Sequence, residues 1–255
     1  MYFKYLLILC SLIIPSKIFA YSFDQKTSDK EIKKFYDFSK MPNYYLPHKY
    51  DTTKKAAQIE NETLKVTVEP GMHGATSDKK CQCKERAELG FRTPINGTTY
   101  YTFKFRIDKN GFKTVDENFN EVRTLIAQIK SYPDKPKGTQ PALAVHADNY
   151  GRAYCTYYKS NSDPKRYSVK LYDLHKIDLN DGEWHKIEMS YKPSKTKGYC
   201  KIVIDDQVIL EKNNLNNLPV KKIKFVRPRI GIYRDSLSYS QTVYYDDLTI
   251  KFTPE

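Results

Sequence analysis

Thr99-Tyr-Tyr-Thr-Phe-Lys-Phe-Arg-Ile107 is the stretch that most clearly indicates the fold, because apolar and polar side chains alternate along it. Successive side chains of a β-strand point to opposite faces, so this run predicts a strand with one face in a core. Comparable alternating or β-branched and aromatic runs give about eleven short strands in all. They cover residues 63–69, 99–107, 122–130, 142–146, 154–158, 184–191, 201–204, 208–210, 222–225, 229–233 and 242–252.

Many short strands separated by turns predict an all-β protein, a jelly-roll sandwich with one concave face left as a ligand groove. Asp205-Asp206-Gln207 lies between two apolar runs and predicts a hairpin turn, since Asp tolerates the turn backbone. One domain is expected over residues 51–255. An extension over residues 21–50, with a short helical pattern at 29–39, is expected to pack on it.

Residues 1–20 have the features of a secretory signal peptide. Lys4 precedes an apolar run over residues 5–15, and Ala20 is a small residue at the predicted cleavage point. A membrane anchor is the alternative, but the run is only about a dozen residues and no second span follows. The mature chain is therefore expected to begin near Tyr21 and to be secreted or periplasmic.

The chain is basic, with a formal charge of +13 that falls to +11 when Lys4 and Lys17 leave with the signal. A field of this sign attracts polyanions: acidic polysaccharide, nucleic acid or an anionic membrane surface. Export argues against nucleic acid, and the lack of a basic amphipathic helix argues against membrane association. An acidic polysaccharide is the expected partner of a monomeric protein, and a merely solubilising surface charge is the alternative.

Four cysteines remain after the signal, and an even number in an exported chain predicts up to two disulfides. Three pairings are possible among Cys81, Cys83, Cys155 and Cys200. If the Cys-Gln-Cys segment is a strand, Cys81 and Cys83 lie on one face and each is expected to reach another neighbour more easily than the other. A zinc site is the weaker reading, because no second close Cys pair or His pair accompanies them.

Three segments share one construction, in which one face of a strand is apolar and the other is polar. They are Lys84-Glu-Arg-Ala-Glu-Leu89, Ala127-Gln-Ile-Lys130 and Arg229-Ile-Gly-Ile-Tyr233. Their polar faces could line a groove and grip a sugar acid, with Gly231 leaving space for a sugar ring to approach the backbone. The alternative is that these polar faces simply meet water, as they do in many antiparallel sheets.

These three segments, in this order and followed by Val243-Tyr-Tyr-Asp-Asp247, resemble the heparin lyase I and glucuronan lyase superfamily of concanavalin-like jelly rolls. The sequence is more distantly similar to alginate lyases. The resemblance covers most of the chain, from about Leu64 to Phe252. It implies a polysaccharide lyase that cleaves uronic-acid-containing chains by β-elimination.

The resemblance also implies roles for single residues. Arg86 and Gln128 would neutralise the uronate carboxylate, because oriented donors stabilise the charge that develops when C5 loses its proton. Tyr233 would be the catalytic acid and is also a candidate base, with Arg229 and Arg234 favouring its phenolate. The family often has a His where this sequence has Lys130, and a Lys acts as a base only if its pKa is lowered toward neutrality.

His146 is a second candidate base, because its strand could lie beside Gln128. Glu88, His146, Arg229 and Arg234 are expected to shape the substrate groove, while His175 and His185 are expected to be structural. No metal ligand set and no cofactor is predicted, although a calcium requirement involving Asp246 and Asp247 stays open.

Two other functions remain open at this level. A lectin-like jelly roll could keep the groove without a base, which the Lys130 departure makes relevant. A cationic surface or adhesion protein could bind polyanions without any groove. The glucanase pattern of paired carboxylates on one strand, the Gly-x-Ser-x-Gly elbow and the phosphate-binding loop are absent from the sequence.

Overall fold

The computed structural model describes fifteen strands, all in two antiparallel sheets. The described residues are 17–21, 44–45, 56–60, 63–74, 80–112, 122–133, 141–147, 152–158, 167–173, 177–218 and 223–255. The all-β jelly roll predicted from strand periodicity is confirmed. Each run predicted as a strand falls on an observed strand.

Sheet A has the strand order β13-β12-β11-β6-β15-β4-β3, and β1 pairs with the second half of β15. Its strands are β1 (Lys17–Tyr21), β3 (Ala57–Glu60), β4 (Thr63–Val68), β6 (Gly97–Arg106), β11 (Trp184–Lys192), β12 (Gly198–Ile204), β13 (Gln207–Leu215) and β15 (Gln241–Pro254).

Sheet B has the strand order β10-β9-β8-β7-β14-β5-β2. Its strands are β2 (Tyr44–Tyr45), β5 (Lys84–Phe91), β7 (Thr124–Pro133), β8 (Leu143–His146), β9 (Arg152–Tyr158), β10 (Tyr167–Asp173) and β14 (Ile223–Asp235). Some strands that are neighbours in a sheet come from distant parts of the chain, as in β5 beside β14.

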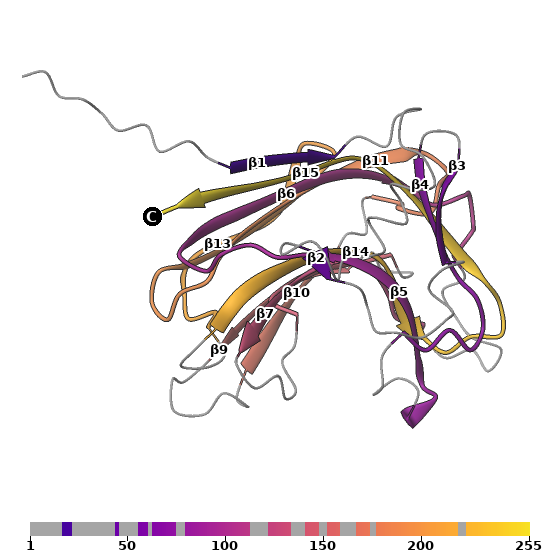
Figure 1. The fold of residues 1–255 in the computed structure, drawn as a ribbon, viewed down its shortest axis with the longest axis horizontal. Coiled ribbons are helices and arrows are strands. Elements are labelled where there is room, and N and C mark those ends of the chain that lie inside the picture. The colour runs from indigo at the N-terminus through magenta and orange to yellow at the C-terminus, as the bar shows by residue number, and fades with distance from the viewer. Residues whose placement is uncertain are drawn as a thin grey trace, which may run out of the picture.

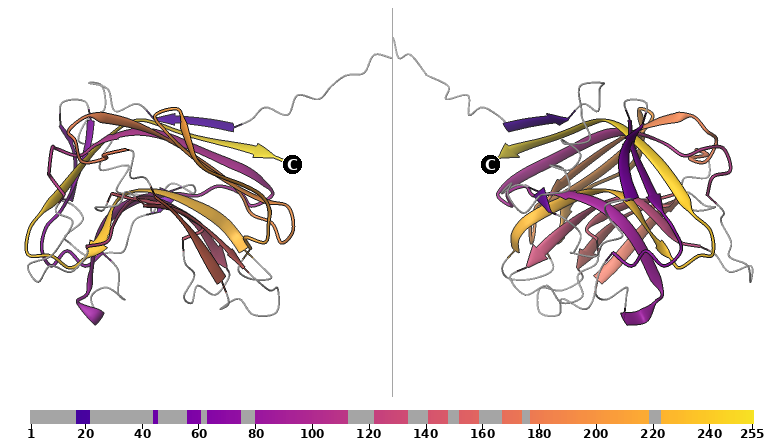
Figure 2. Two further views of the ribbon diagram at one scale, coloured as in Figure 1. Left: turned by 180° about the vertical axis from the view of Figure 1, so that it is seen from behind. Right: turned by 45° about the vertical axis from the view of Figure 1, so that its right-hand side comes forward.

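The core lies between the two sheets. Sheet A contributes Tyr101 and Phe103, and sheet B contributes Ile126 and Ile230, all fully buried. The burial pattern of β6 alternates along its whole length, so its other face is turned to solvent. Both sheets bend in the same direction, with sheet A across the top and the concave face of sheet B turned away from it (Figures 1 and 2). Any polar group on that concave face is therefore outside the core.

One long strand, β14, replaces the two strands predicted over residues 222–225 and 229–233. Pro228 lies inside it, although proline has no N–H to donate to a ladder. The ladder between β14 and β5 ends at the pair of Arg229 and Gly90, next to Pro228. On the other side of Pro228, Val226 forms a single bridge with Thr93. The break in that ladder accommodates the proline, which is why the strand continues.

The two disulfides correct an expectation. Cys81 and Cys83 bond to each other, because the segment is a turn in which Gln82 has φ of +51° and not a strand. Cys155 on β9 bonds to Cys200 on β12, and both cysteines are buried. The second bond therefore joins sheet B to sheet A.

Local turns and bulges follow residue type. Asp205 and Asp206, both with positive φ, form a two-residue hairpin turn between β12 and β13, while Gln207 of the predicted turn is the first residue of β13. Positive φ at both turn positions is the backbone of the hairpin turns that match strand twist. Asp247, with φ of +50°, marks a bulge inside β15 and not the end of a strand.

Parts of the predicted N-terminal organisation fall outside the described residues, among them the helical pattern at 29–39. Within residues 21–50, β2 pairs with the end of β5. Within residues 1–20, Lys17–Tyr21 pairs with Leu248–Phe252 of β15. No helix in the described part of the chain could cross a bilayer.

Candidate active site

The three polar segments predicted to form a groove lie on adjacent strands of sheet B and face the same way. Arg229 of β14 is paired with Gln128 of β7, Arg227 with Lys130, and Tyr233 with Arg86 of β5. Alternation along each strand then places their side chains on the concave face, while Ala87, Leu89, Ile230 and Ile232 are buried on the core side. The sequence-predicted convergence of the three segments is confirmed in the structure.

Glu88 is the centre of a buried polar cluster on this face. Its Oε2 accepts a hydrogen bond from Arg229 Nη1 at 2.7 Å and lies 3.6 Å from Arg86 Nη1, and its Oε1 accepts one from the Gln128 amide. Exposed fractions are 5% for Glu88, 3% for Gln128 and 6% for Arg229. Burial alone would raise the pKa of Glu88, but Arg229, Arg86 and the hydrogen bonds outweigh it, so the pKa is lowered. Glu88 is thus a carboxylate that orients its neighbours.

Lys130 lies beside this cluster, opposite Arg227. Burial, followed by the charges of Arg229 and Arg86, lowers the pKa of Lys130 to about 8, while Glu88 opposes the change. An amine with this pKa is partly unprotonated near neutral pH, which is the condition for accepting a proton. The residue that stands in place of the expected His can therefore act as a base.

Tyr233 lies on the other side of Glu88, in contact with Arg86. The Arg86 guanidinium carbon is 4.0 Å from the centre of the Tyr233 ring. A cation stacked on the ring restricts its orientation and places positive charge beside the phenol. Arg86 thus provides the positive charge beside Tyr233 that was expected from Arg229 and Arg234.

His146 lies in the same row across the sheet as Tyr233. His146 of β8 is paired with Leu125 of β7, and Leu125 is paired with Tyr233. The His146 ring is buried, and its centre is 5.5 Å from that of Tyr154. His146 therefore remains a second candidate base beside Lys130.

Arg234 is not on the concave face, which corrects its expected place beside Tyr233. Consecutive strand residues point to opposite faces, so Arg234 points the other way and pairs with Glu85. Arg234 Nε and Nη2 lie 2.8 and 2.7 Å from Glu85 Oε2, and both side chains are buried. This ion pair belongs to the body of the sandwich.

Gly231 also has a different role from the one expected. A Cβ at Gly231 would lie 2.1 Å from the Ala87 carbonyl oxygen, so the neighbouring strand fills the space expected for a sugar ring. The glycine has φ of +125° and lies where the register of β14 against β7 shifts. Glycine is needed here because β5 packs too closely for any side chain.

Tyr245 contacts this irregular backbone from the core side. It comes from β15 of the opposite sheet, accepts from the Gly231 N–H at 3.1 Å, and its hydroxyl is 2.9 Å from the Ile126 carbonyl oxygen. Its ring is fully buried. Tyr245 thus fixes both strands close to Tyr233 without reaching the concave face.

Sequence reasoning missed Arg227 and Tyr245. Arg227 alternates with Arg229 and Tyr233 along one strand, but it lies between the two strands predicted over residues 222–225 and 229–233. Nothing in the local sequence indicates the role of Tyr245, because it depends on the packing of one sheet against the other. His185, in contrast, is structural as expected and binds Asp205 and Asp181, while His175 lies outside the described residues.

The concave face therefore brings together a phenol with a guanidinium stacked on its ring, a lysine of lowered pKa and several arginines. Such a set can neutralise a carboxylate, remove a nearby proton and protonate a leaving oxygen. Across the described ranges, no group of three or more His, Cys, Asp or Glu side chains is placed to hold a metal ion.

Comparisons with known proteins show the family and the fold of the chain. A family model for polysaccharide lyases matches residues 25–249. An endo-β-1,4-glucuronan lyase from the fungus Trichoderma reesei is 17% identical, over 78% of this chain and 84% of its own, with a TM-score of 0.54. Alginate lyase Aly36B, as a double alanine mutant in complex with alginate tetrasaccharide, is 13% identical, over 93% of this chain and 97% of its own, with a TM-score of 0.62.

A third similar structure is an endo-β-galactosidase from Clostridium perfringens that releases GlcNAcα1-4Gal. It is 13% identical, over 94% of this chain and 63% of its own, with a TM-score of 0.56. Identities this low show a shared fold alone. No curated protein sequence matches the chain.

Proposed function

The chain belongs to the polysaccharide lyase family, and we propose that it is exported and cleaves a uronic-acid-containing polysaccharide by β-elimination. The observation that carries the proposal is the lowered pKa of Lys130 among arginines on the concave face. A face built from buried cations suits a polyanionic substrate. The names of two similar structures, a glucuronan lyase and an alginate lyase, also support a polymer of uronic acids.

The first requirement of the reaction is to neutralise the uronate carboxylate. The C5–H bond is a poor acid until the adjacent carboxylate can take up negative charge, so a fixed cation next to it lowers the barrier. Arg86 is the best placed group, because its guanidinium is partly exposed and meets a carboxylate with two parallel N–H donors. Gln128 and Arg229 already donate hydrogen bonds to Glu88 and so fix the position of the Glu88 carboxylate at the floor of the site.

The second requirement is a proton acceptor and a proton donor. Unprotonated Lys130 takes the C5 proton, the C4–O bond breaks as the C4=C5 double bond forms, and the Tyr233 hydroxyl gives its proton to the departing oxygen. Lysine is left as an ammonium and tyrosine as a phenolate, and exchange with water restores both. Arg86, stacked on the Tyr233 ring, stabilises the phenolate.

The test is the ultraviolet absorbance of the unsaturated uronate product. Purified protein lacking residues 1–20 is incubated separately with glucuronan, alginate, heparin-type and chondroitin-type chains. Absorbance is expected to rise with one of these substrates. The rate of this rise is expected to be about two to four orders of magnitude lower in Tyr233→Phe, since only the proton donor is removed. Tyr199→Phe is the matched control, because the Tyr199 hydroxyl bonds to Glu211 on an exposed part of sheet A.

No rise with any of the four polymers, with saturable binding retained, would contradict the proposed reaction. Equal rates for Tyr233→Phe and Tyr199→Phe would leave the reaction in place but remove Tyr233 from it. Export has its own test, which is the N-terminal residue of protein recovered outside a secreting host cell. Tyr21 is the expected first residue.

A further inference from the structure

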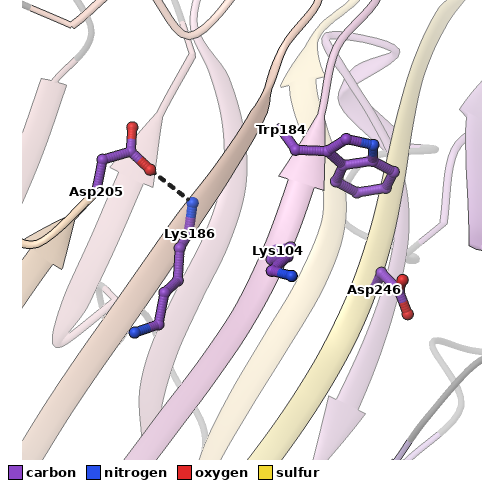
Figure 3. Close-up of a pocket in the computed structure, with 5 residues that line it drawn as sticks. All are labelled: Lys104, Trp184, Lys186, Asp205 and Asp246. Carbon is purple, nitrogen blue, oxygen red and sulfur yellow. Dashed lines mark hydrogen bonds between the residues drawn. The ribbon is translucent and has the colours of Figure 1, made fainter.

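A second hollow lies on the convex face of sheet A, on the opposite side of the sandwich from Lys130 and Tyr233. It has a volume of about 380 Å³ and is formed by the first part of β11, by β6, by β15 and by the β12–β13 turn. Figure 3 shows the indole of Trp184 at one end, near Asp246, with Lys104 between the indole and the Lys186–Asp205 pair. The residues that line it are Lys104, Trp184, Lys186, Asp205 and Asp246.

Trp184 is the outstanding feature of this hollow. It is the single tryptophan of the chain, and it is 40% exposed. A large aromatic side chain usually contributes to a core or an interface, so an exposed indole beside a hollow indicates a surface that something covers. The guanidinium carbon of Arg106 lies 5.6 Å from the ring centre and supports the indole.

The charged groups of the hollow are balanced, unlike those of the concave face. Lys104 Nζ lies 2.7 Å from Asp247, and Lys186 Nζ lies 2.6 Å from Glu188. Each ammonium group already has a carboxylate beside it. A polyanion would have to displace these carboxylates, so the hollow does not select for charge.

Asp205 shows that the polar lining is fixed in place. Its Oδ1 accepts from the Lys186 backbone N–H at 2.8 Å, and its Oδ2 lies 2.7 Å from His185 Nδ1. Carboxylate oxygens keep further acceptor sites after two such bonds. The hollow thus combines an apolar ring face with held acceptors and donors, which is the composition of sites that bind small polar molecules.

A pyranose ring has this chemistry. One of its faces carries C–H groups that stack on an indole, and its hydroxyls donate to carboxylates and accept from ammonium groups. A row of alternating aromatic and basic side chains also crosses sheet A at this level, from Trp184 through Arg106 and Tyr244 to Lys65. Adjacent strands are about 4.8 Å apart, which is close to the length of one sugar unit in an extended glycan.

We propose that this hollow is a second, non-catalytic saccharide site, in which Trp184 stacks on a pyranose ring of a polysaccharide chain. The chain then continues across β6 and β15 over Arg106 and Tyr244. The choice of a saccharide as the ligand rests on the proposed function, whereas the site itself shares no residue with the concave face. Its role is to hold the enzyme on polymer while the concave face cleaves.

The first experiment uses the intrinsic fluorescence of Trp184, which reports on this hollow alone because the chain has no other tryptophan. The full mature chain carrying Tyr233→Phe is titrated with alginate, with glucuronan and with a neutral glucan chain. The salt is raised to about 1 M, where the screening length is about 3 Å and exposed charge attraction is suppressed. A saturable change of emission that persists in high salt is the expected result.

The second experiment is affinity electrophoresis through gels that contain each polysaccharide. Trp184→Ala is expected to lose at least tenfold in apparent affinity. Tyr100→Ala is the matched control, because Tyr100 is also 40% exposed on the convex face but does not line the hollow, and its affinity is expected to stay unchanged. Binding of the neutral chain as well as the acidic ones identifies the ring face and hydroxyls as the recognised groups.

The inference is overturned if no polysaccharide changes the Trp184 emission, or if Trp184→Ala and Tyr100→Ala migrate alike. It is also overturned if the emission change disappears in high salt, since that identifies charge as the recognised feature. Failure of the proposed function is seen separately, as the absence of unsaturated product with the unaltered protein.

Discussion

The two outer faces of the sandwich differ in how deeply their charged side chains are buried. On the concave face of sheet B, Glu88 and Arg229 are almost completely buried and hydrogen-bonded to each other. On the convex face of sheet A, ion pairs such as Lys104–Asp247 are formed by side chains that are about half exposed. Burying charge is costly unless partners and hydrogen bonds compensate, so a buried cluster at a surface is a strong indication of chemistry, whereas exposed pairs contribute little.

The largest effect on activity is expected on substitution of Lys130 on the concave face. In the unaltered enzyme kcat/KM should rise with pH through about 8, because only the unprotonated amine accepts a proton. Lys130→Arg keeps the positive charge but cannot lose a proton. Above a pH of about 8 its rate is expected to lie about two to four orders of magnitude below that of the unaltered enzyme, and it should not rise with pH through about 8, measured by product absorbance over a series of buffers.

His146→Gln is the control for this experiment, because His146 is the other candidate base. If Lys130 is the base, His146→Gln keeps the rise of kcat/KM with pH. A Lys130→Arg enzyme with nearly full activity, together with an inactive His146→Gln enzyme, would transfer the role to His146.

The second-largest effect, a loss of folding stability, is expected on substitution of Glu88. Glu88→Gln leaves the Arg229 guanidinium buried beside a neutral group, so the free energy of unfolding should fall by about 3 to 5 kcal/mol. Glu188→Gln is the matched change on the convex face, where it breaks the exposed contact with Lys186 and should cost under about 1 kcal/mol. Urea unfolding at neutral pH measures both, and equal losses would remove the contrast between the faces.

The same variant has a pH signature. The pKa of Glu88 is lowered in the folded protein, so its contribution to stability is present above the unfolded pKa of about 4.3. That contribution is lost as the pH falls through the folded pKa. The difference in stability between the unaltered protein and Glu88→Gln should therefore narrow in acid.

The smallest effect is expected at His185, which is hydrogen-bonded to Asp205 of the convex hollow. Burial would lower the pKa of His185, but hydrogen bonds to Asp205 and Asp181 outweigh it, so the pKa is raised. The resulting stabilisation is fully present below the unfolded pKa of about 6.5 and is lost as the pH rises through the folded pKa. The free energies of unfolding of the unaltered protein and His185→Gln should differ by about 1 kcal/mol or less, and this difference should disappear at alkaline pH. A difference that does not change with pH would contradict this account.

Alternation of side chains was sufficient to predict much of this molecule. The period of two along β6, β11 and β15 identifies strands with one buried face, and Asp205-Asp206 identifies a hairpin, because both signals are local. The same period placed Arg86, Gln128 and Tyr233 on one polar surface. The same period places Arg234 on the other face of the strand from Tyr233, so the position of Arg234 away from the concave face was predictable from the sequence.

The remaining features depend on contacts between distant parts of the chain. The close approach of β5 to Gly231, the support from Tyr245 and the lowered pKa of Lys130 each require the register of two or more strands. The Cys81–Cys83 bond depends on the left-handed backbone of Gln82, which no composition rule predicts for glutamine. The continuous strand across Pro228 was not predicted, because the tolerance of a proline depends on a gap in the neighbouring ladder.

The bond between Cys155 and Cys200 has a consequence for the unfolded chain. The two residues are 45 positions apart, and the intervening ring contains β10 and β11. A cross-link over that separation removes disorder worth about 4 kcal/mol from the unfolded ensemble on a chain-entropy description. An oxidised chain that loses its structure therefore stays a closed ring with two tails, in which β9 and β12 remain neighbours, and the search for the two-layer arrangement starts partly completed.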